Sequence, residues 1–150
     1  MNKNKGVDYM CNNNENNNTC ESCIQEILKV IMLLQQSVCQ NDCCLDTCDK
    51  GFLGQNSAVF FNTRPVSLYT CGSGNTPLAL PISKDPDETT TSTVFRLEKL
   101  DGCCATFRVL TTNPDTTSVY PFVSTNSFFT INLNCVCIIR CLNDTFIDTI

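Results

Sequence analysis

Near the C-terminus the chain reads Cys135-Val136-Cys137-Ile138-Ile139-Arg140-Cys141-Leu142. Its β-branched residues favour an extended strand, and the side chains of a strand alternate between two faces. Cys135, Cys137 and Cys141 are then expected on one face, together with Ile139. A single cysteine on such a strand is as readily a small buried apolar residue as a reactive thiol. Three cysteines in one row indicate a sheet that can be cross-linked.

The cysteine content is high for the size of the chain, with 13 cysteines in 150 residues. A chain of this length can bury an apolar core without disulfides, so the cysteines predict a role beyond foldability. Because their number is odd, at least one cannot pair within the chain. The candidate cross-linking residues are Cys11, Cys20, Cys23, Cys39, Cys43, Cys44, Cys48, Cys71, Cys103, Cys104, Cys135, Cys137 and Cys141.

The chain contains no histidine. This absence removes Cys-His nucleophile pairs, Ser-His-Asp triads and mixed Cys/His zinc sites. A net charge of -5 disfavours nucleic acid as a partner. Charged residues make up only 17% of the chain, below the roughly 25% of typical soluble domains. We therefore expect a protein that is not an enzyme, has no cofactor, and contacts other protein over much of its surface.

The N-terminus carries Lys3 and Lys5 but no apolar segment behind them. No apolar run approaches the length of a membrane span, so we expect neither a secretion signal nor a membrane partner. Thiols inside cells are normally kept reduced. The cysteines are therefore expected either to hold metal or to be oxidised later, on a surface that cell lysis releases.

The composition divides the chain into an arm and one domain. Asn dominates residues 1–19, which predicts a disordered arm. Residues 20–150 are expected to form a single cysteine-rich domain. Within it we predict a helix at about 22–38, a cysteine-rich connection at 39–54 and a β domain at 57–150.

Apolar residues recur at helical spacing at Ile24, Ile27, Leu28, Ile31, Leu34 and Val38. Ser22, with Gln25 three residues later, fits a capping box at the start of this helix. Val30, Met32 and Leu33 widen the apolar stripe until little of the helix is polar. Such a helix must be covered on most sides. The cover is expected either from a neighbouring subunit or from the chain's own sheet.

Two cysteine patterns allow other chemistry. Cys20 and Cys23 form a C-x-x-C pair at the helix start, but a redox motif of the thioredoxin kind needs a preceding strand and here follows the Asn-rich arm. Four cysteines lie within residues 39–48, but their spacing does not match the paired C-x2-C of zinc ribbons. We expect no metal site. A cysteine-only metal-binding module or a thiol redox protein is the alternative function.

Short strands and turns are expected after residue 57. The predicted strands are 58–61, 66–71, 94–100, 103–110, 118–123 and 128–133, and 83–93 is a predicted surface loop. Asp101-Gly102 is a strong hairpin signal between two of these strands. The fold class expected is mostly β, an antiparallel β-sandwich-like domain preceded by one N-terminal α-helix and a disordered arm.

Four arginines lie in or beside predicted strands, at Arg64, Arg96, Arg108 and Arg140. Solvent-facing or edge positions are one explanation. The other is ion pairing between subunits, with Glu98, Asp101 or Asp144 as partners.

Several blocks of the sequence resemble one family in the same order. These blocks are Phe52-Leu53-Gly54, Asn62-Thr63-Arg64-Pro65, Leu68-Tyr69-Thr70, Phe95-Arg96-Leu97-Glu98, Cys104-Ala105-Thr106-Phe107-Arg108-Val109-Leu110 and the C-terminal run from Cys135 to Leu142. The chain resembles Bacillus spore coat proteins of the CotY/CotZ group, to which the exosporium protein ExsY belongs. The resemblance extends from Ile24 to the end.

The resemblance implies a non-enzymatic, cysteine-rich building block of the outer spore layers, the exosporium, crust or outer coat. Such proteins are made in the mother-cell cytoplasm and assemble into hexagonal two-dimensional lattices that disulfides reinforce. The implied partners are further copies of the chain, in hexameric rings and lattices, and other coat or exosporium proteins. The implied function is a protective permeability barrier.

The mobile Cys11 and Cys20 are expected to reach neighbouring subunits. The cysteines of the C-terminal strand are expected to bond within the chain, to Cys103, Cys104 or Cys71.

Overall fold

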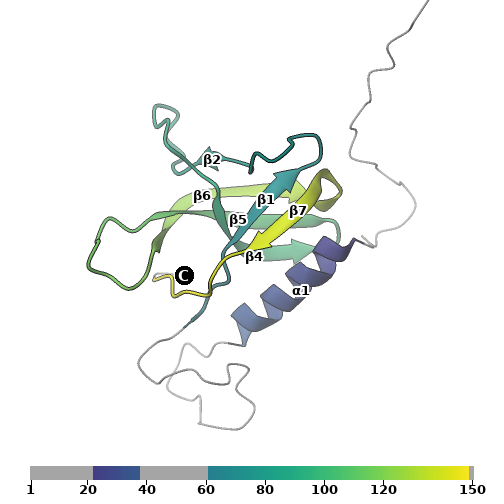
Figure 1. The fold of residues 1–150 in the computed structure, drawn as a ribbon, viewed down its shortest axis with the longest axis horizontal. Helices are drawn as coiled ribbons and strands as arrows, with labels where there is room; N and C mark the ends of the chain where they lie inside the picture. The colour runs from purple at the N-terminus through teal and green to yellow at the C-terminus, as the bar shows by residue number, and fades with distance from the viewer. Residues whose placement is uncertain (1–21, 38–60, 149–150) are drawn as a thin grey trace, which may run out of the picture.

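A computed structural model describes residues 22–37 and 61–148 (Figure 1). It confirms a mostly β, antiparallel domain with one helix near the N-terminus. The elements are α1 (Cys23–Gln36), β1 (Val66–Thr70), β2 (Leu80–Pro81), β3 (Thr91–Ser92), β4 (Val94–Asp101), β5 (Cys104–Thr112), β6 (Phe122–Asn132), η1 (Leu133–Cys135) and β7 (Val136–Cys141). One five-stranded sheet has the order β6-β5-β4-β1-β7, and β2 pairs with β3.

Several predicted features lie outside the described residues: the arm at 1–19, the connection at 39–54, most of the strand at 58–61, Val38, Cys11, Cys20, Cys39, Cys43, Cys44 and Cys48. In the described part of the chain, no helix is long and apolar enough to cross a membrane.

Only half of the predicted capping box forms at the start of α1. Ser22 is the N-cap, and its Oγ accepts a hydrogen bond from the backbone N–H of Gln25 at 3.1 Å. In a capping box the Gln25 side chain would return to the backbone of Ser22. Instead its Nε2 donates to the carbonyl of Gly102 at 2.9 Å. The residue expected to complete the cap thus ties the helix to the β4–β5 hairpin.

A second glutamine ties the other end of α1 to the same strand. Nε2 of Gln35 donates to the carbonyl of Leu97 at 2.8 Å. The ten residues from Gln25 to Gln35 span about 15 Å of helix, and the five from Leu97 to Gly102 span about 17 Å of strand. β1 pairs with β4 only through Val66 and Phe95, so the rest of this edge of β4 has no strand partner among the described residues. The helix lies along that part of β4.

The structure shows one of the two predicted forms of helix cover, that by the chain's own sheet. Ile24, Leu28 and Ile31 are buried in the core cluster beneath the chain's own sheet. Other apolar residues of the helix, Ile27, Val30 and Leu33, are exposed. The chain's own sheet thus covers one side of α1 and leaves a second apolar side at the surface.

The core is centred on three aromatic rings from β4, β5 and β6. Phe129 lies edge-on to Phe95, with ring centroids 4.7 Å apart, and stacks on Phe107 at 5.4 Å. Leu68 of β1 and the buried face of α1 belong to the same cluster. Figure 1 shows β1 and β7 crossing in front of β5 and β6, with α1 beside β7 and β4.

The C-terminal strands differ from the prediction in two places. The predicted strands 118–123 and 128–133 are one strand, β6, and residues 118–121 belong to a loop. Residues 124–127, which separated the two predicted strands, are part of β6. The hydroxyl of Thr125 holds them there by donating to the carbonyl of Val109 at 2.6 Å. In the predicted loop at 83–93, Thr91–Ser92 forms β3.

Cys135 does not lie on the C-terminal strand. It ends the 3-10 turn η1, which Asn132 caps by accepting from the N–H of Asn134 at 3.0 Å. Within β7 the ladder with β1 is irregular opposite Tyr69 and Thr70. The prediction that one strand face carries all three of Cys135, Cys137 and Cys141 is therefore wrong for Cys135, whereas Cys137 and Cys141 both lie in β7.

Candidate functional site

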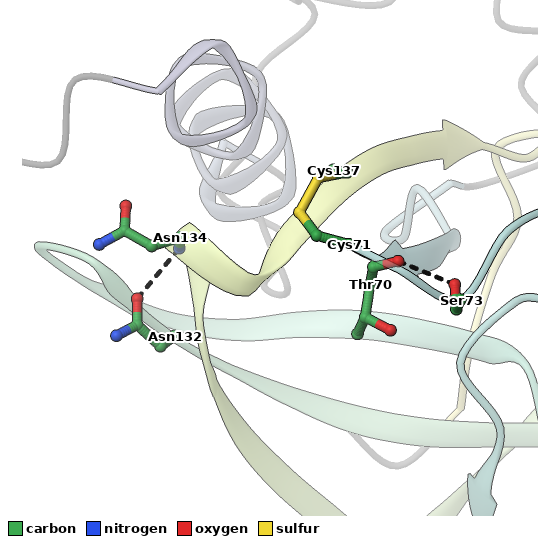
Figure 2. The surroundings of a disulfide bond; sticks show 6 residues. All are labelled: Thr70, Cys71, Ser73, Asn132, Asn134 and Cys137. Atoms are coloured by element: carbon green, nitrogen blue, oxygen red, sulfur yellow. Dashed lines mark hydrogen bonds between the residues drawn. A yellow bond between two sulfur atoms is a disulfide. The ribbon is translucent and has the colours of Figure 1, made fainter. Parts of the chain in front are cut away.

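Most of the described cysteines gather at one end of the domain, which we call the cysteine pole: Cys23, Cys71, Cys103, Cys104, Cys135 and Cys137. Its centre is the disulfide Cys71–Cys137, which joins the end of β1 to the start of β7 across 66 residues of sequence (Figure 2). Beside it the N–H of Cys71 donates to the carbonyl of Cys135 at 2.9 Å. The carbonyl of Cys103 accepts from the N–H of Leu133 at 2.7 Å, which brings the β4–β5 hairpin to the same place.

The cysteine pole contains both bonded and free sulfurs. Cys103 and Cys135 are disulfide-bonded, in addition to Cys71 and Cys137. Cys104 follows Cys103 directly, yet it is free and exposed. Cys23, the first residue of α1, is also free and exposed, and the bond from Gln25 to Gly102 holds its turn of helix near the hairpin.

The other end of β7 continues into a segment held by hydrogen bonds and an ion pair. We call this the polar clasp, formed by residues 61–65 and 142–148. The N–H of Leu142 donates to the carbonyl of Pro65 at 2.8 Å, and Thr63 and Thr145 form an antiparallel bridge. Asn62 pairs with the backbone of Ile147 in both directions, each bond at 2.9 Å. Ile147, only 1% exposed, is thereby fixed in the interior.

Ion pairs support the clasp from two sides. Arg64 bonds Asp144 through two contacts of 2.7 and 2.8 Å, and this hydrogen bonding raises the pKa of Arg64. Nε of the buried Arg96 donates to Oγ1 of Thr63 at 2.8 Å. Arg96 also pairs with Glu98 at 3.1 Å. Its burial lowers the pKa of Arg96, because a guanidinium loses hydration in the interior.

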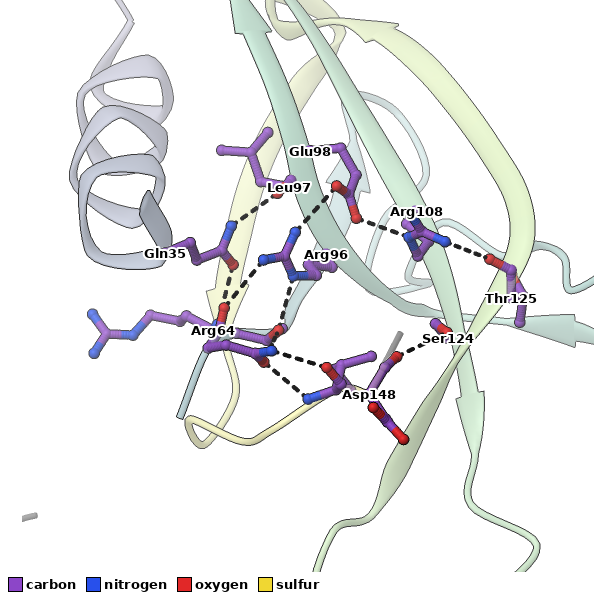
Figure 3. A network of polar contacts seen from close by, with 12 residues as sticks. Gln35, Arg64, Arg96, Leu97, Glu98, Arg108, Ser124, Thr125 and Asp148 are labelled. Atoms are coloured by element: carbon purple, nitrogen blue, oxygen red, sulfur yellow. Dashed lines mark hydrogen bonds and ion pairs between the residues drawn. The ribbon is translucent and has the colours of Figure 1, made fainter. Parts of the chain in front are cut away.

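Glu98 has a second arginine partner. Arg108 pairs with Glu98 at 2.8 Å and donates to the carbonyl of Thr125 (Figure 3). Its guanidinium carbon also lies 4.4 Å from the ring centroid of Phe128. Two explanations were predicted for the arginines: solvent-facing or edge positions, or ion pairs between subunits with Glu98, Asp101 or Asp144. The pairs form within one chain instead, because β4, β5 and the clasp bring them together.

Cys141 is the described cysteine farthest from the cysteine pole along β7. It stands opposite Val66 in the β1–β7 ladder, at the clasp end, and is free and exposed. The chain therefore presents free thiols at both ends of the domain.

The described residues do not build a metal centre. In 22–37 and 61–148, no group of three or more His, Cys, Asp or Glu side chains is placed to hold a metal ion. The cysteines of residues 39–48, and Cys20 of the C-x-x-C pair, lie outside that part of the chain.

Sequence reasoning missed the roles of Asn62, Gln25 and Gln35. Residues 62–65 were considered only for the family resemblance and, at Arg64, for ion pairing, although they carry most of the clasp. The sequence does place hydrogen-bonding side chains just before the strand at 66–71 and just after the C-terminal strand. Because buried polar groups need partners, this placement could have predicted a contact between the two segments.

A small mostly β domain with exposed free thiols and internal disulfides defines a class of cross-linkable structural protein. The chain belongs to the spore coat protein Z family, whose model matches residues 10–122. The match ends at the first residue of β6, so η1 and β7 lie beyond it. No curated protein and no solved structure matches the chain.

Family membership confirms the resemblance to the CotY/CotZ group. It gives the chain a structural role in the spore coat and a location at the spore surface. It also suggests a non-enzymatic protein that associates with other coat proteins.

Proposed function

We propose that copies of this chain assemble into an ordered two-dimensional, hexagonal layer of the outer spore surface, in the exosporium, crust or outer coat. Disulfides between copies reinforce the layer, and the layer acts as a protective permeability barrier. Residues 20–150 form the building block, and the arm at 1–19 supplies one further cysteine, Cys11. The proposal rests on the spore coat family and on three free, exposed thiols, at Cys23, Cys104 and Cys141.

The distribution of the thiols supports this proposal. Cys23 and Cys104 lie near the cysteine pole, and Cys141 lies at the clasp end. A building block with bonding groups at both ends can join neighbours on two sides, and closed rings linked by two-fold contacts tile a plane. A molecule with one reactive thiol would stop at a dimer.

The internal bonds support it as well. The disulfide Cys71–Cys137 and the ion pairs of the clasp close within one chain. The domain is thus stabilised without its neighbours, and the exposed thiols remain available for contacts between chains. Cys11 and Cys20 remain candidates for the same role.

The test is negative-stain electron microscopy of the purified full-length protein, with and without reductant and heat. We expect ordered sheets or stacked rings that disperse only when reductant and heat are combined. A matched variant, Cys23→Ser/Cys104→Ser/Cys141→Ser, keeps the Cys71–Cys137 disulfide, and we expect its assemblies to disperse more easily. Monomers of the wild-type chain under every condition would contradict the proposal.

A further inference from the structure

The five-stranded sheet ends at β6, which has a strand neighbour on one side only. That neighbour is β5, and in the described part of the chain no strand lies on the other side of β6. β6 is also the longest of the described strands, with 11 residues. Its residues 128–132 pair one-to-one with residues 108–104 of β5. We call the outer side of residues 128–132 the open edge.

One hydrogen bond fixes which backbone groups of the open edge are turned outward. The N–H of Leu133 donates to the carbonyl of Cys103 at 2.7 Å. Along an antiparallel pair, residues that bond across the ladder alternate with residues whose N–H and C=O groups point away from it. Counting back from Leu133, every second residue bonds β5. Phe128 and Thr130 lie between those residues, so their backbone groups point outward.

The side chains agree with this assignment. Opposite residues that do not bond through the backbone bring their side chains closer together. Thr130 stands opposite Thr106, and their hydroxyl oxygens are 2.9 Å apart. Phe128 stands opposite Arg108, whose guanidinium carbon lies 4.4 Å from the centroid of the ring. Both pairs therefore leave the N–H and C=O groups of the β6 residue to the open edge.

The open edge lacks the usual protection of an edge strand. Charged residues, proline and short length normally keep an exposed edge from pairing. No Asp, Glu, Lys or Arg occurs between Asp115 and Arg140, and β6 contains no proline. The opposite edge of the sheet, β7, is shorter and carries the exposed Arg140. Of the two edges, β6 is thus the better template for a further strand.

A second copy of the chain offers a strand that matches the open edge. Two β6 strands that run antiparallel about Phe129 place Phe128 of each copy opposite Thr130 of the other. The outward N–H and C=O groups of both residues then bond each other, and the same edge serves both copies. Two chains of net charge -5 repel each other. The uncharged β6 lets them meet without bringing like charges into contact.

We infer that the open edge joins a second copy of the chain, β6 beside β6 and antiparallel, so that two five-stranded sheets continue as one. This inference rests on the proposed assembly and names one of its contacts. Main-chain hydrogen bonds provide the affinity when a strand is added to a sheet edge. The contact needs no oxidant, so it can form before disulfides link the copies.

The test is hydrogen exchange of the full-length protein, measured residue by residue in dilute, dispersed protein and in its assemblies. The amides of Phe129 and Ile131 bond β5 and should exchange slowly in both states. The amides of Phe128 and Thr130 should exchange fast in the dispersed protein. On assembly we expect exchange at these two amides to slow about ten-fold or more.

Two variants separate the open edge from the strand beside it. Thr130→Lys places a charge on the open edge, and Thr106→Lys places the same charge on β5. Each variant loses the same contact between the two hydroxyls. We expect Thr130→Lys to abolish the slowing at Phe128 and Thr106→Lys to retain it. The folding control is the Cys71–Cys137 peptide pair, which both variants should keep.

The outcomes also separate this inference from the proposed function. Ordered sheets in which the amides of Phe128 and Thr130 still exchange fast would overturn the edge contact alone. Slow exchange at both amides in the dispersed protein would overturn it too, because a segment of the same chain would then cover the edge. Protection that rises with protein concentration, without any sheets, would support the edge contact and contradict the lattice.

Discussion

The two ends of β7 are held by different chemistry. At its start the disulfide Cys71–Cys137 joins it to β1. Beyond its last residue, the chain is held in the polar clasp by Asn62, by the bridge of Thr63 with Thr145, and by the pair of Arg64 with Asp144. Reductant can thus break the hold on one end, whereas the other end depends on hydrogen bonds and an ion pair.

This difference shows how a cysteine-rich chain can stay folded before it is oxidised. The clasp, the two glutamine bonds of α1 and the aromatic core need no oxidant. We expect the disulfides to add stability to a fold that already exists, and the free thiols to be left for contacts between chains. Changes at each end of β7 can test this division.

The largest effect is expected at the clasp, from Arg96→Ala. Arg96 is 7% exposed and bonds Thr63, Asn62 and Glu98. Removing one member of a buried ion pair costs about 3–5 kcal/mol, and the lower figure applies because Glu98 keeps Arg108. Urea unfolding should show this loss, and Arg140→Ala, at an exposed site, should show almost none. A loss below about 1 kcal/mol for Arg96→Ala would contradict a supporting role in the clasp.

The next effect is expected at the cysteine pole, from Cys71→Ser/Cys137→Ser. The disulfide closes a loop of 66 residues, and such bonds stabilise by about 2–4 kcal/mol, mainly by restricting the unfolded chain. The free energy of unfolding should fall by that amount when measured without reductant. Cys104→Ser removes a free thiol and should leave it unchanged. A double variant that did not fold would show that the clasp cannot keep β7 in place without the disulfide.

A smaller and local effect is expected from Asn62→Ala. The variant loses two hydrogen bonds to the backbone of Ile147, at about 1 kcal/mol each. Hydrogen exchange should quicken at the amide of Ile147. It should stay slow at the amide of Cys71, which bonds Cys135 at the other end. Asn126→Ala, at an exposed position of β6, is the matched control. Equal quickening at both amides would mean that the two ends act as one unit.

The smallest effect is expected from acid, through Asp115. Hydrogen bonds from the side chain and the N–H of Thr117 lower the pKa of this carboxylate. A carboxylate with a lowered folded-state pKa stabilises above its ordinary pKa and loses that contribution as the pH falls through the folded value. Its loop reaches the clasp through Tyr120, whose ring lies 5.5 Å from that of Phe146.

NMR titration should therefore show the loop and Phe146 shifting together at low pH, with the amide of Cys71 unmoved. Asp115→Asn should abolish this response. A response centred on the cysteine pole would contradict the division of chemistry between the two ends.

Local patterns predicted much of the fold. Asp101-Gly102 predicted the β4–β5 hairpin, and the apolar spacing after Ser22 predicted α1. Both signals are local, because turn geometry and helical periodicity depend on residues that are close in sequence. The single strand β6 was not predictable in the same way. Its central Ser124-Thr125-Asn126 resembles a turn, and Thr125 is held in the sheet by bonds to the adjacent strand, to the carbonyl of Val109 and from the side chain of Arg108.

The candidate site was predictable only in part. Cysteine count and absent histidine pointed to cross-linking, and Cys71 was named as a partner of the C-terminal cysteines. The reason Cys135 leaves the strand is the cap by Asn132, a short-range signal overlooked beside a strong strand pattern. The arginine partners Glu98 and Asp144 could be proposed from charge, but their location within one chain depends on long-range pairing of strands.

The central claim is that surface thiols join the chains while the Cys71–Cys137 bond stays within each chain. The most direct measurement assembles a mixture of isotopically light and heavy chains and maps the disulfide-linked peptides without reduction. We predict that Cys71–Cys137 pairs carry one isotope only, and that links through Cys23, Cys104 or Cys141 include mixed pairs. Mixed-isotope Cys71–Cys137 pairs at a statistical ratio would contradict the account.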